Sequence, residues 1–189
     1  MDAYSHIKTF LGIIVGLAAA QLLGGMARIV QHPRKLKIYW IHLLWTLFLF
    51  LFLLHFWWWE FNLQRIVAFT FAVYFFIAVF AVLLYFLCSL FYPTQLDDYD
   101  SYRDYFYSRQ RWIYSMMALV FLADIGDTAI KGAAYWHQLG LMYDIRVTSF
   151  LLLSIAAIWI KRPWFHAFFA IFATLYEIAY ILHLNFRIG

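Results

Sequence analysis

The stretch IYWIHLLWTLFLFLFLLHFWWW, residues 38–59, decides the fold of this chain. It contains no Lys, Arg, Asp or Glu from end to end. An α-helix rises 1.5 Å per residue, so about 20 apolar residues cross the roughly 30 Å hydrocarbon core of a bilayer. The stretch also lacks the alternation of polar and apolar residues that a membrane β-strand requires. It therefore predicts a membrane-spanning helix.

Similar apolar runs recur along the whole chain, separated by short polar segments. Hydrophobic residues make up 66% of the sequence and charged residues only 13%, where soluble proteins have about a quarter charged. The fold class is therefore an all-α integral membrane protein, a bundle of six transmembrane helices that forms a single domain over residues 1–189. The predicted spans are residues 7–30, 38–59, 66–92, 112–130, 141–160 and 163–186.

The basic residues lie mostly in the segments between these runs, which argues for a topology signal and against a nucleic-acid-binding face. With six spans, nine of them fall on one side of the bilayer and five on the other. Positive segments stay cytoplasmic, so both termini are predicted on the non-cytoplasmic side of a cytoplasmic (inner) membrane. The nine are Arg28, Arg34, Lys35, Lys37, Arg103, Arg109, Arg111, Lys161 and Arg162, and the five are Lys8, Arg65, Lys131, Arg146 and Arg187.

The two halves of the chain show a weak internal similarity. A shift of 103 positions places Arg28 on Lys131 and residues 20–22 on residues 123–125, and the second span then falls on the fifth. Three helices per half would give the repeats opposite orientations, an arrangement that many transporters have. A 3+3 inverted repeat and chance similarity of apolar helices both remain open.

Residues 93–111 form the one long segment of soluble character. Aromatic residues three or four positions apart would share one face of a helix, which favours an interfacial helix lying on the cytoplasmic surface. A solvated linker is the alternative, and the part from Asp97 to Arg111 is a candidate docking segment for a cytoplasmic partner. Its acidic residues are Asp97, Asp98, Asp100 and Asp104, and its aromatic residues are Tyr99, Tyr102, Tyr105, Phe106 and Tyr107.

Two other local patterns indicate how the helices are placed. Trp57, Trp58 and Trp59 come in sequence at the end of an apolar run and predict an interfacial aromatic belt. Gly24 and Gly25 offer a small-residue surface on which another helix can pack closely.

Acidic residues inside the spans are the strongest functional signal, because a charge in hydrocarbon costs a few kcal/mol unless it meets a partner, a cavity or a pathway. Asp124 lies about 13 residues in from Arg111, and Glu177 about 14 in from Pro163. Both carboxylates are therefore expected roughly 20 Å deep from the cytoplasmic side. His55 and His183 lie further toward the outer face.

Three interpretations of these groups follow. In the first, Asp124, Asp127, Glu177, His55 and His183 line an outward-facing polar cavity that binds a cation or relays protons. In the second, Asp124, Glu177 and a histidine bind a metal ion. In the third, Asp127 pairs with Lys131 one turn later, while Asp124 and Glu177 hydrogen-bond to polar residues across helices.

Cofactor and enzyme chemistry has little sequence support. His42 and His55 are thirteen apart, and His166 and His183 seventeen apart, so a haem would need two histidine pairs whose spacings do not match. The sequence has no His-Glu-x-x-His or Gly-x-Ser-x-Gly motif, and its single Cys88 is expected to be buried and inert.

The leading functional hypothesis is a small channel or transporter for an ion, proton or small solute, with or without homo-oligomerisation. It uses no assigned cofactor, although a metal ion is kept as an alternative. A membrane-embedded metal or haem enzyme, and an accessory or sensory subunit that docks a partner, are the competing hypotheses.

Overall fold

The computed structural model describes residues 3–32, 37–66, 69–95 and 98–187, with side chains left out at 3–5, 65 and 184–187. The chain in these ranges is helical, and six of its helices are long and apolar enough to cross a membrane. The prediction of an all-helical chain with six membrane-length helices is therefore confirmed. In order, the elements are α1 (Ala3–Gln31), α2 (Trp40–Trp59), the 3₁₀ helix η1 (Glu60–Arg65), α3 (Phe71–Ser89), α4 (Tyr102–Lys131), α5 (Ala133–Leu139), α6 (Leu141–Trp159) and α7 (Pro163–Arg187).

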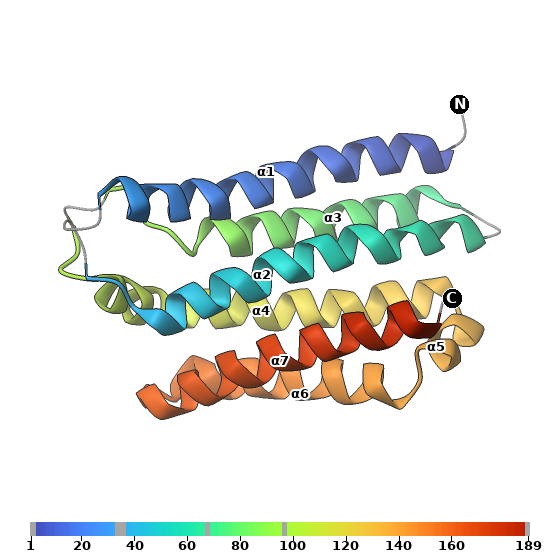
Figure 1. The fold of residues 1–189 in the computed structure, drawn as a ribbon. Coiled ribbons are helices and arrows are strands. Elements are labelled where there is room, and N and C mark those ends of the chain that lie inside the picture. The colour runs from blue at the N-terminus through green and yellow to red at the C-terminus, as the bar shows by residue number, and fades with distance from the viewer. Residues whose placement is uncertain (1–2, 33–36, 67–68, 96–97, 188–189) are drawn as a thin grey trace.

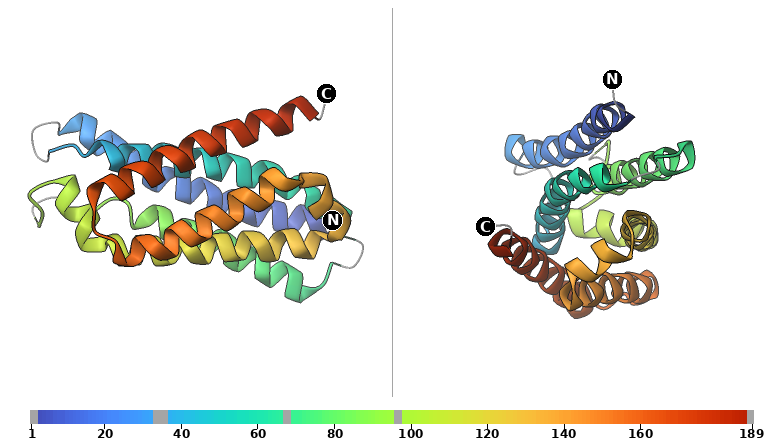
Figure 2. Two further views of the ribbon diagram at one scale, coloured as in Figure 1. Left: turned by 90° about the horizontal axis from the view of Figure 1, so that it is seen from below. Right: turned by 90° about the vertical axis from the view of Figure 1, so that its right-hand side faces the viewer.

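The long helices run side by side, so the bundle has two ends (Figures 1 and 2). One end holds the start of α1, η1, α5 and the end of α7, and we call it the terminal face. The other end holds residues 90–95, 98–101 and 160–162, and we call it the loop face. This grouping agrees with the sides on which the basic residues were expected, although Arg34 and Lys35 lie outside the described residues.

The helix pairs with the most extensive contacts are α4 with α6, α1 with α3, and α2 with α7. The first helix of the amino-terminal half thus packs mainly on the third, whereas the first helix of the carboxy-terminal half packs mainly on the second long helix. The two halves do not share one packing order, and the inverted repeat is not confirmed.

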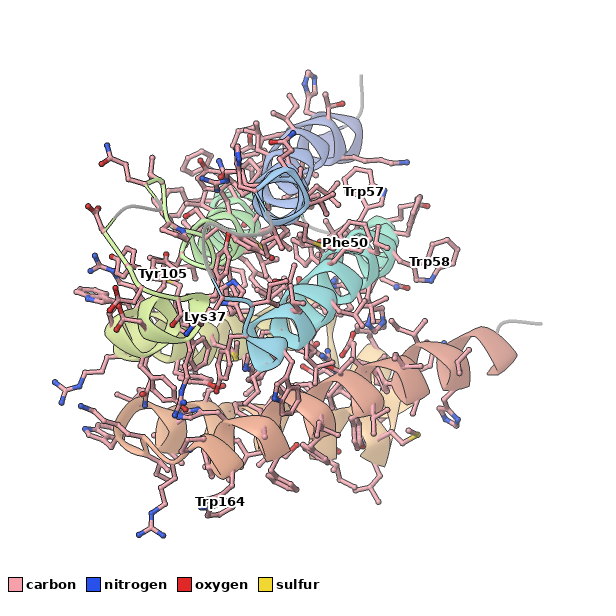
Figure 3. The ribbon with its side chains drawn as sticks, turned by 60° about the vertical axis from the view of Figure 1, so that its left-hand side comes forward. Lys37, Phe50, Trp57, Trp58, Tyr105 and Trp164 are labelled. Atoms are coloured by element: carbon pink, nitrogen blue, oxygen red, sulfur yellow. The ribbon has the colours of Figure 1, made fainter. Side chains whose placement is uncertain are left out.

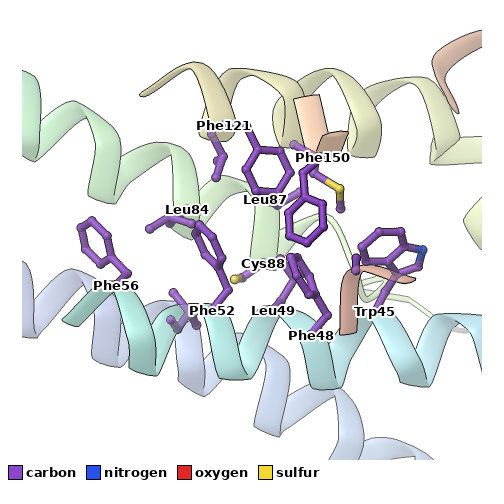
Figure 4. Close-up of a cluster of buried hydrophobic side chains, with 14 of the residues drawn as sticks. Trp45, Phe48, Leu49, Phe52, Phe56, Leu84, Leu87, Cys88, Phe121 and Phe150 are labelled. Atoms are coloured by element: carbon purple, nitrogen blue, oxygen red, sulfur yellow. The ribbon is translucent and has the colours of Figure 1, made fainter. Parts of the chain in front are cut away.

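Aromatic rings fill the middle of the bundle (Figure 4). Phe150 of α6 lies 5.7 Å from Phe48 of α2 and 5.3 Å from Phe121 of α4, measured between ring centroids. Phe52 meets Phe121 edge-on at 5.8 Å. Such offset and edge-on ring pairs contribute beyond their buried area. Cys88 is buried beside this layer, as predicted.

The segment at residues 93–111 differs from the prediction of a separate surface helix. Residues 102–111 are instead the first turns of α4, which has 30 residues and is about 45 Å long. Tyr102, Tyr105 and Phe106 are buried against the bundle, and all three rings surround His42 of α2. Part of the periodic aromatic face therefore packs on the bundle, and the interfacial position of the segment stays a prediction. Asp97 lies outside the described residues, and docking of a partner here stays a prediction.

The three consecutive tryptophans also have different environments. Trp58 is 54% exposed and points away from the bundle (Figure 3), as an interfacial residue would. Trp57 is half-buried against Gly12, and Trp59 is buried in the interior. The prediction of an aromatic belt is therefore wrong for Trp59, because consecutive residues of a helix point about 100° apart.

Gly25 of α1 packs closely on the ring of Tyr92, which follows the end of α3, whereas the sequence predicted the close approach of another helix. A Cβ atom at Gly25 would lie 2.1 Å from the ring of Tyr92, whereas one at Gly24 would meet nothing within 4 Å. The hydroxyl oxygen of Tyr92 lies 2.9 Å from Thr46 Oγ1, and this hydrogen bond holds the ring in place.

We expect Gly25→Ala to destabilise the protein by about 1–3 kcal/mol, the usual cost of overpacking a filled core. Gly24→Ala, one residue earlier, should be neutral or slightly stabilising because alanine is the better helix former. Thermal unfolding in detergent, followed by circular dichroism, measures both. Equal stability of the two variants would contradict the close packing of α1 on Tyr92.

Candidate functional site

Four long helices contribute one polar side chain each to a buried cluster near the terminal face. These are His55 of α2, Asp124 of α4, Arg146 of α6 and Glu177 of α7, and none is more than 5% exposed. Arg146 donates from Nη2 to Asp124 Oδ2 at 2.9 Å and from Nη1 to Glu177 Oε2 at 3.3 Å. His55 Nδ1 lies 2.6 Å from Glu177 Oε1. We call these four residues the arginine network.

Aromatic rings enclose the guanidinium of Arg146. Its Cζ atom lies 5.0 Å from the ring centroid of Tyr180, 5.3 Å from Trp59, 5.5 Å from Phe52 and 5.8 Å from Tyr143. The electron-rich faces of such rings attract a desolvated cation. The cation is thus stabilised both by carboxylates and by rings in a place from which bulk water is excluded.

A second buried cluster lies next to the first. Lys131, the last residue of α4, donates to Asp127 Oδ2 at 2.6 Å and to Glu60 Oε1 at 2.9 Å. We call these three residues the lysine network. Its Asp127–Lys131 pair confirms the pairing one turn apart that the sequence predicted. Asp124 and Asp127 lie three residues apart on α4, so the two networks share one helix face.

The short helix α5 covers both networks at the terminal face. Gly132 and Gly140 flank it with positive φ angles of 100° and 71°, a backbone conformation that favours glycine. Tyr135 of α5 is buried with its ring 5.7 Å from Lys131 Nζ, and burial raises the pKa of Tyr135 to about 12. The phenol therefore stays neutral at physiological pH and adds no charge to the cluster.

Negative charge exceeds permanent positive charge in the two networks. The two networks contain four carboxylates, those of Asp124, Glu177, Asp127 and Glu60, and two permanent cations, Arg146 and Lys131. Their net charge therefore depends on the protonation of His55 and of the carboxylates. Several polar atoms also lack a partner among the described side chains. They are His55 Nε2, Arg146 Nε, Glu60 Oε2 and Asp127 Oδ1. Unbalanced charge is expensive in a low-dielectric interior, so this arrangement favours uptake of protons or a cation.

A small cavity adjoins the arginine network. Its volume of about 20 Å³ gives room for one water molecule. Such a water could bridge groups that the protein leaves unpaired. The lining residues come from five helices and include His55, Trp59, Asp124, Thr128, Tyr135, Leu139, Tyr143, Arg146 and Tyr180.

The structure groups the predicted site residues differently from the sequence. Asp124, Glu177 and His55 converge on one guanidinium, and Asp127 belongs to the lysine network. His183 is half-buried and takes no part in the ion pairs of the described residues. From the sequence, Arg146 was expected at the border of the outer face, whereas the structure buries its guanidinium between Asp124 and Glu177.

The histidines considered as haem ligands do not face one another in pairs. His42 is buried among the rings of Phe91, Tyr92 and other aromatic residues, and neither of its ring nitrogens has a partner in the described part of the chain. His166 Nδ1 lies 2.9 Å from the hydroxyl of Tyr114. Over the described ranges, no group of three or more His, Cys, Asp or Glu side chains could hold a metal ion.

Comparison with known proteins found no matching family model, no similar curated protein and no similar solved structure. Any function must therefore be argued from the two networks, the cavity and the surrounding helices.

Replacing Arg146 with Met should destabilise the protein by about 3–5 kcal/mol, because Asp124 and Glu177 would remain buried without their cation. Adding Glu177→Gln to Arg146→Met should recover part of that loss, since one unpaired charge disappears. Chemical unfolding in mild detergent measures the free energy of unfolding of the wild type, of Arg146→Met and of the double variant.

The exposed Arg162→Met serves as the control and should unfold like the wild type. An Arg146→Met protein of wild-type stability would show that the buried ion pairs do not hold these helices together.

Proposed function

We propose that the protein is a small membrane transport protein that carries protons or a small cation. The observation that supports this most is the surplus of buried carboxylates over permanent cations beside a water-sized cavity. A purely structural ion pair needs no such surplus, whereas a group that takes up and releases a positive charge does. His55, Asp124, Asp127 and Glu177 would lie along the pathway, and a place for His183 in it stays a prediction.

Short contacts link the groups that would exchange the charge. The 2.6 Å separation of His55 Nδ1 and Glu177 Oε1 suits direct proton transfer between an imidazole and a carboxylate. Arg146 joins Glu177 to Asp124, and Asp124 is followed by Asp127 on the same face of α4. Protonation at one carboxylate would therefore change the electrostatic energy of the others.

The aromatic layer acts as the barrier in this proposal. Phe48, Phe52, Phe121 and Phe150 lie on the loop-face side of the network residues that their own helices carry, as the residue order along α2, α4 and α6 shows, and their rings contact one another. An apolar constriction excludes water and ions until the helices move apart. Beyond it, Thr46 Oγ1 lies within hydrogen-bond distance of the Tyr92 hydroxyl, which offers polar groups on the loop-face side. The conformation described is then a closed one.

The orientation belongs to the same proposal. The loop face, which carries the larger share of Lys and Arg, would lie in the cytoplasm of a cell bounded by a cytoplasmic membrane, and the terminal face outside. An inverted 3+3 repeat and assembly into a homo-oligomer would suit a transporter of this size, and both stay predictions.

In liposomes with a trapped pH-sensitive dye, we expect Glu177→Gln and Asp124→Asn to slow transport at least roughly tenfold. Such a change corresponds to about 1.4 kcal/mol of barrier. Ser154→Ala changes a fully buried side chain on α6 that belongs to neither network, and it should transport like the wild type. Unchanged flux in both carboxylate variants, or no flux in the wild type with any small cation, would remove the proposal.

Cysteine labelling tests the orientation, because the native Cys88 is buried and should not react. Thr94→Cys lies on the loop face and Ala134→Cys on α5 at the terminal face, and both positions are exposed. In intact cells, a membrane-impermeant maleimide should label Ala134→Cys, and it should label Thr94→Cys only after the cells are broken. The opposite pattern would place the termini in the cytoplasm.

A further inference from the structure

Glu60 is a buried acid that the sequence placed in a connecting segment between two spans. It begins η1 at the end of α2 and is only 4% exposed. Its Oε1 atom accepts the hydrogen bond from Lys131, whereas its Oε2 atom is buried and has no partner among the described side chains. Besides Lys131, only the indole of Trp59 interacts favourably with this carboxylate among the described side chains, so desolvation of Oε2 costs free energy as long as Glu60 is ionised.

The charges around Glu60 do not balance. Within the lysine network, the ammonium of Lys131 faces two carboxylates, those of Glu60 and Asp127. Lys8 of α1 is the other described cation nearby, but its Nζ lies 4.5 Å from the centre of the Phe61 ring and forms no ion pair with Glu60. Asp124, three residues from Asp127, is already paired with Arg146. One added proton would make the lysine network neutral.

A second small cavity distinguishes Glu60 from Asp127. It has a volume of about 10 Å³, enough for about one water molecule, and Glu60 lines it while Asp127 does not. A water in this cavity could accept the hydrogen bond of a protonated Glu60 and exchange its proton with the terminal face. The lining residues are Lys8, Leu11, Trp57, Glu60, Phe61 and Leu63.

We infer that Glu60 is a proton-binding site that loads the pathway from the terminal face and that its Oε2 atom carries the proton. From there, a proton reaches the arginine network through Asp127 and Asp124, with Lys131 holding the two carboxylates of the lysine network close together. The role in loading depends on the proposed transport function. The bound proton itself does not.

Infrared spectroscopy of the purified protein in lipid nanodiscs at neutral pH tests the bound proton directly. The wild type should show the carbonyl stretch of a protonated carboxyl group. Glu60→Gln and Asp127→Asn should both lose this band, because either change leaves one carboxylate for one ammonium. Glu177→Gln, which alters the other network, should keep it.

Conservative variants then locate the proton. Glu60→Asp keeps the charge and should move the band to another frequency, whereas Asp127→Glu should leave it where it is. A wild type without the band, or a band that moves in Asp127→Glu and not in Glu60→Asp, would overturn the inference. The infrared experiment does not depend on transport, so its result can be combined with the liposome flux. A protein that shows the band but has no flux would refute the proposed function alone. A protein that transports but lacks the band would refute the proton site alone.

Discussion

The contact of the Arg146 guanidinium with Asp124 and Glu177 is the interaction on which the carboxy-terminal part of the bundle depends. It joins α4, α6 and α7, and His55 extends it to α2. In a bilayer the lipid tails are as apolar as leucine, so burying apolar side chains between helices gives little driving force. Polar groups that would be unpaired in lipid can instead select one arrangement of the helices, as the arginine network does here.

The same contact constrains any function of the molecule. The rings of Phe52, Trp59, Tyr143 and Tyr180 and two carboxylates stabilise one fixed cation. The remaining carboxylates exceed the available positive charge, and on this surplus rests the proposal that the polar end of the bundle takes up protons or cations. In the proposed function, the aromatic layer on the inner side of these groups would keep this charge from crossing unless helices move. Stability and transport would therefore be adjusted by the same few groups.

Local chemistry explains which predictions agree with the structure. Gly25 packs closely because it lacks a side chain, and Asp127 pairs with Lys131 because residues one turn apart are neighbours on any helix. Predictions that depended on the direction in which a side chain points from its helix were less accurate. Trp59 turns inward, and the aromatic residues Tyr102, Tyr105 and Phe106 join the core. Glu60 was missed since nothing in its local sequence indicates a partner 71 residues away.

The sequence by itself determined that the chain forms six membrane-length helices and where Asp124, Asp127 and Glu177 lie along theirs. Hydropathy and rise per residue are local properties, so both can be counted along the chain. Only the tertiary structure decided that Asp124 and Glu177 meet at Arg146, and that Glu60 joins Lys131. The direction in which a side chain points depends on how each helix is rotated against its neighbours, and that rotation results from contacts between residues far apart in sequence.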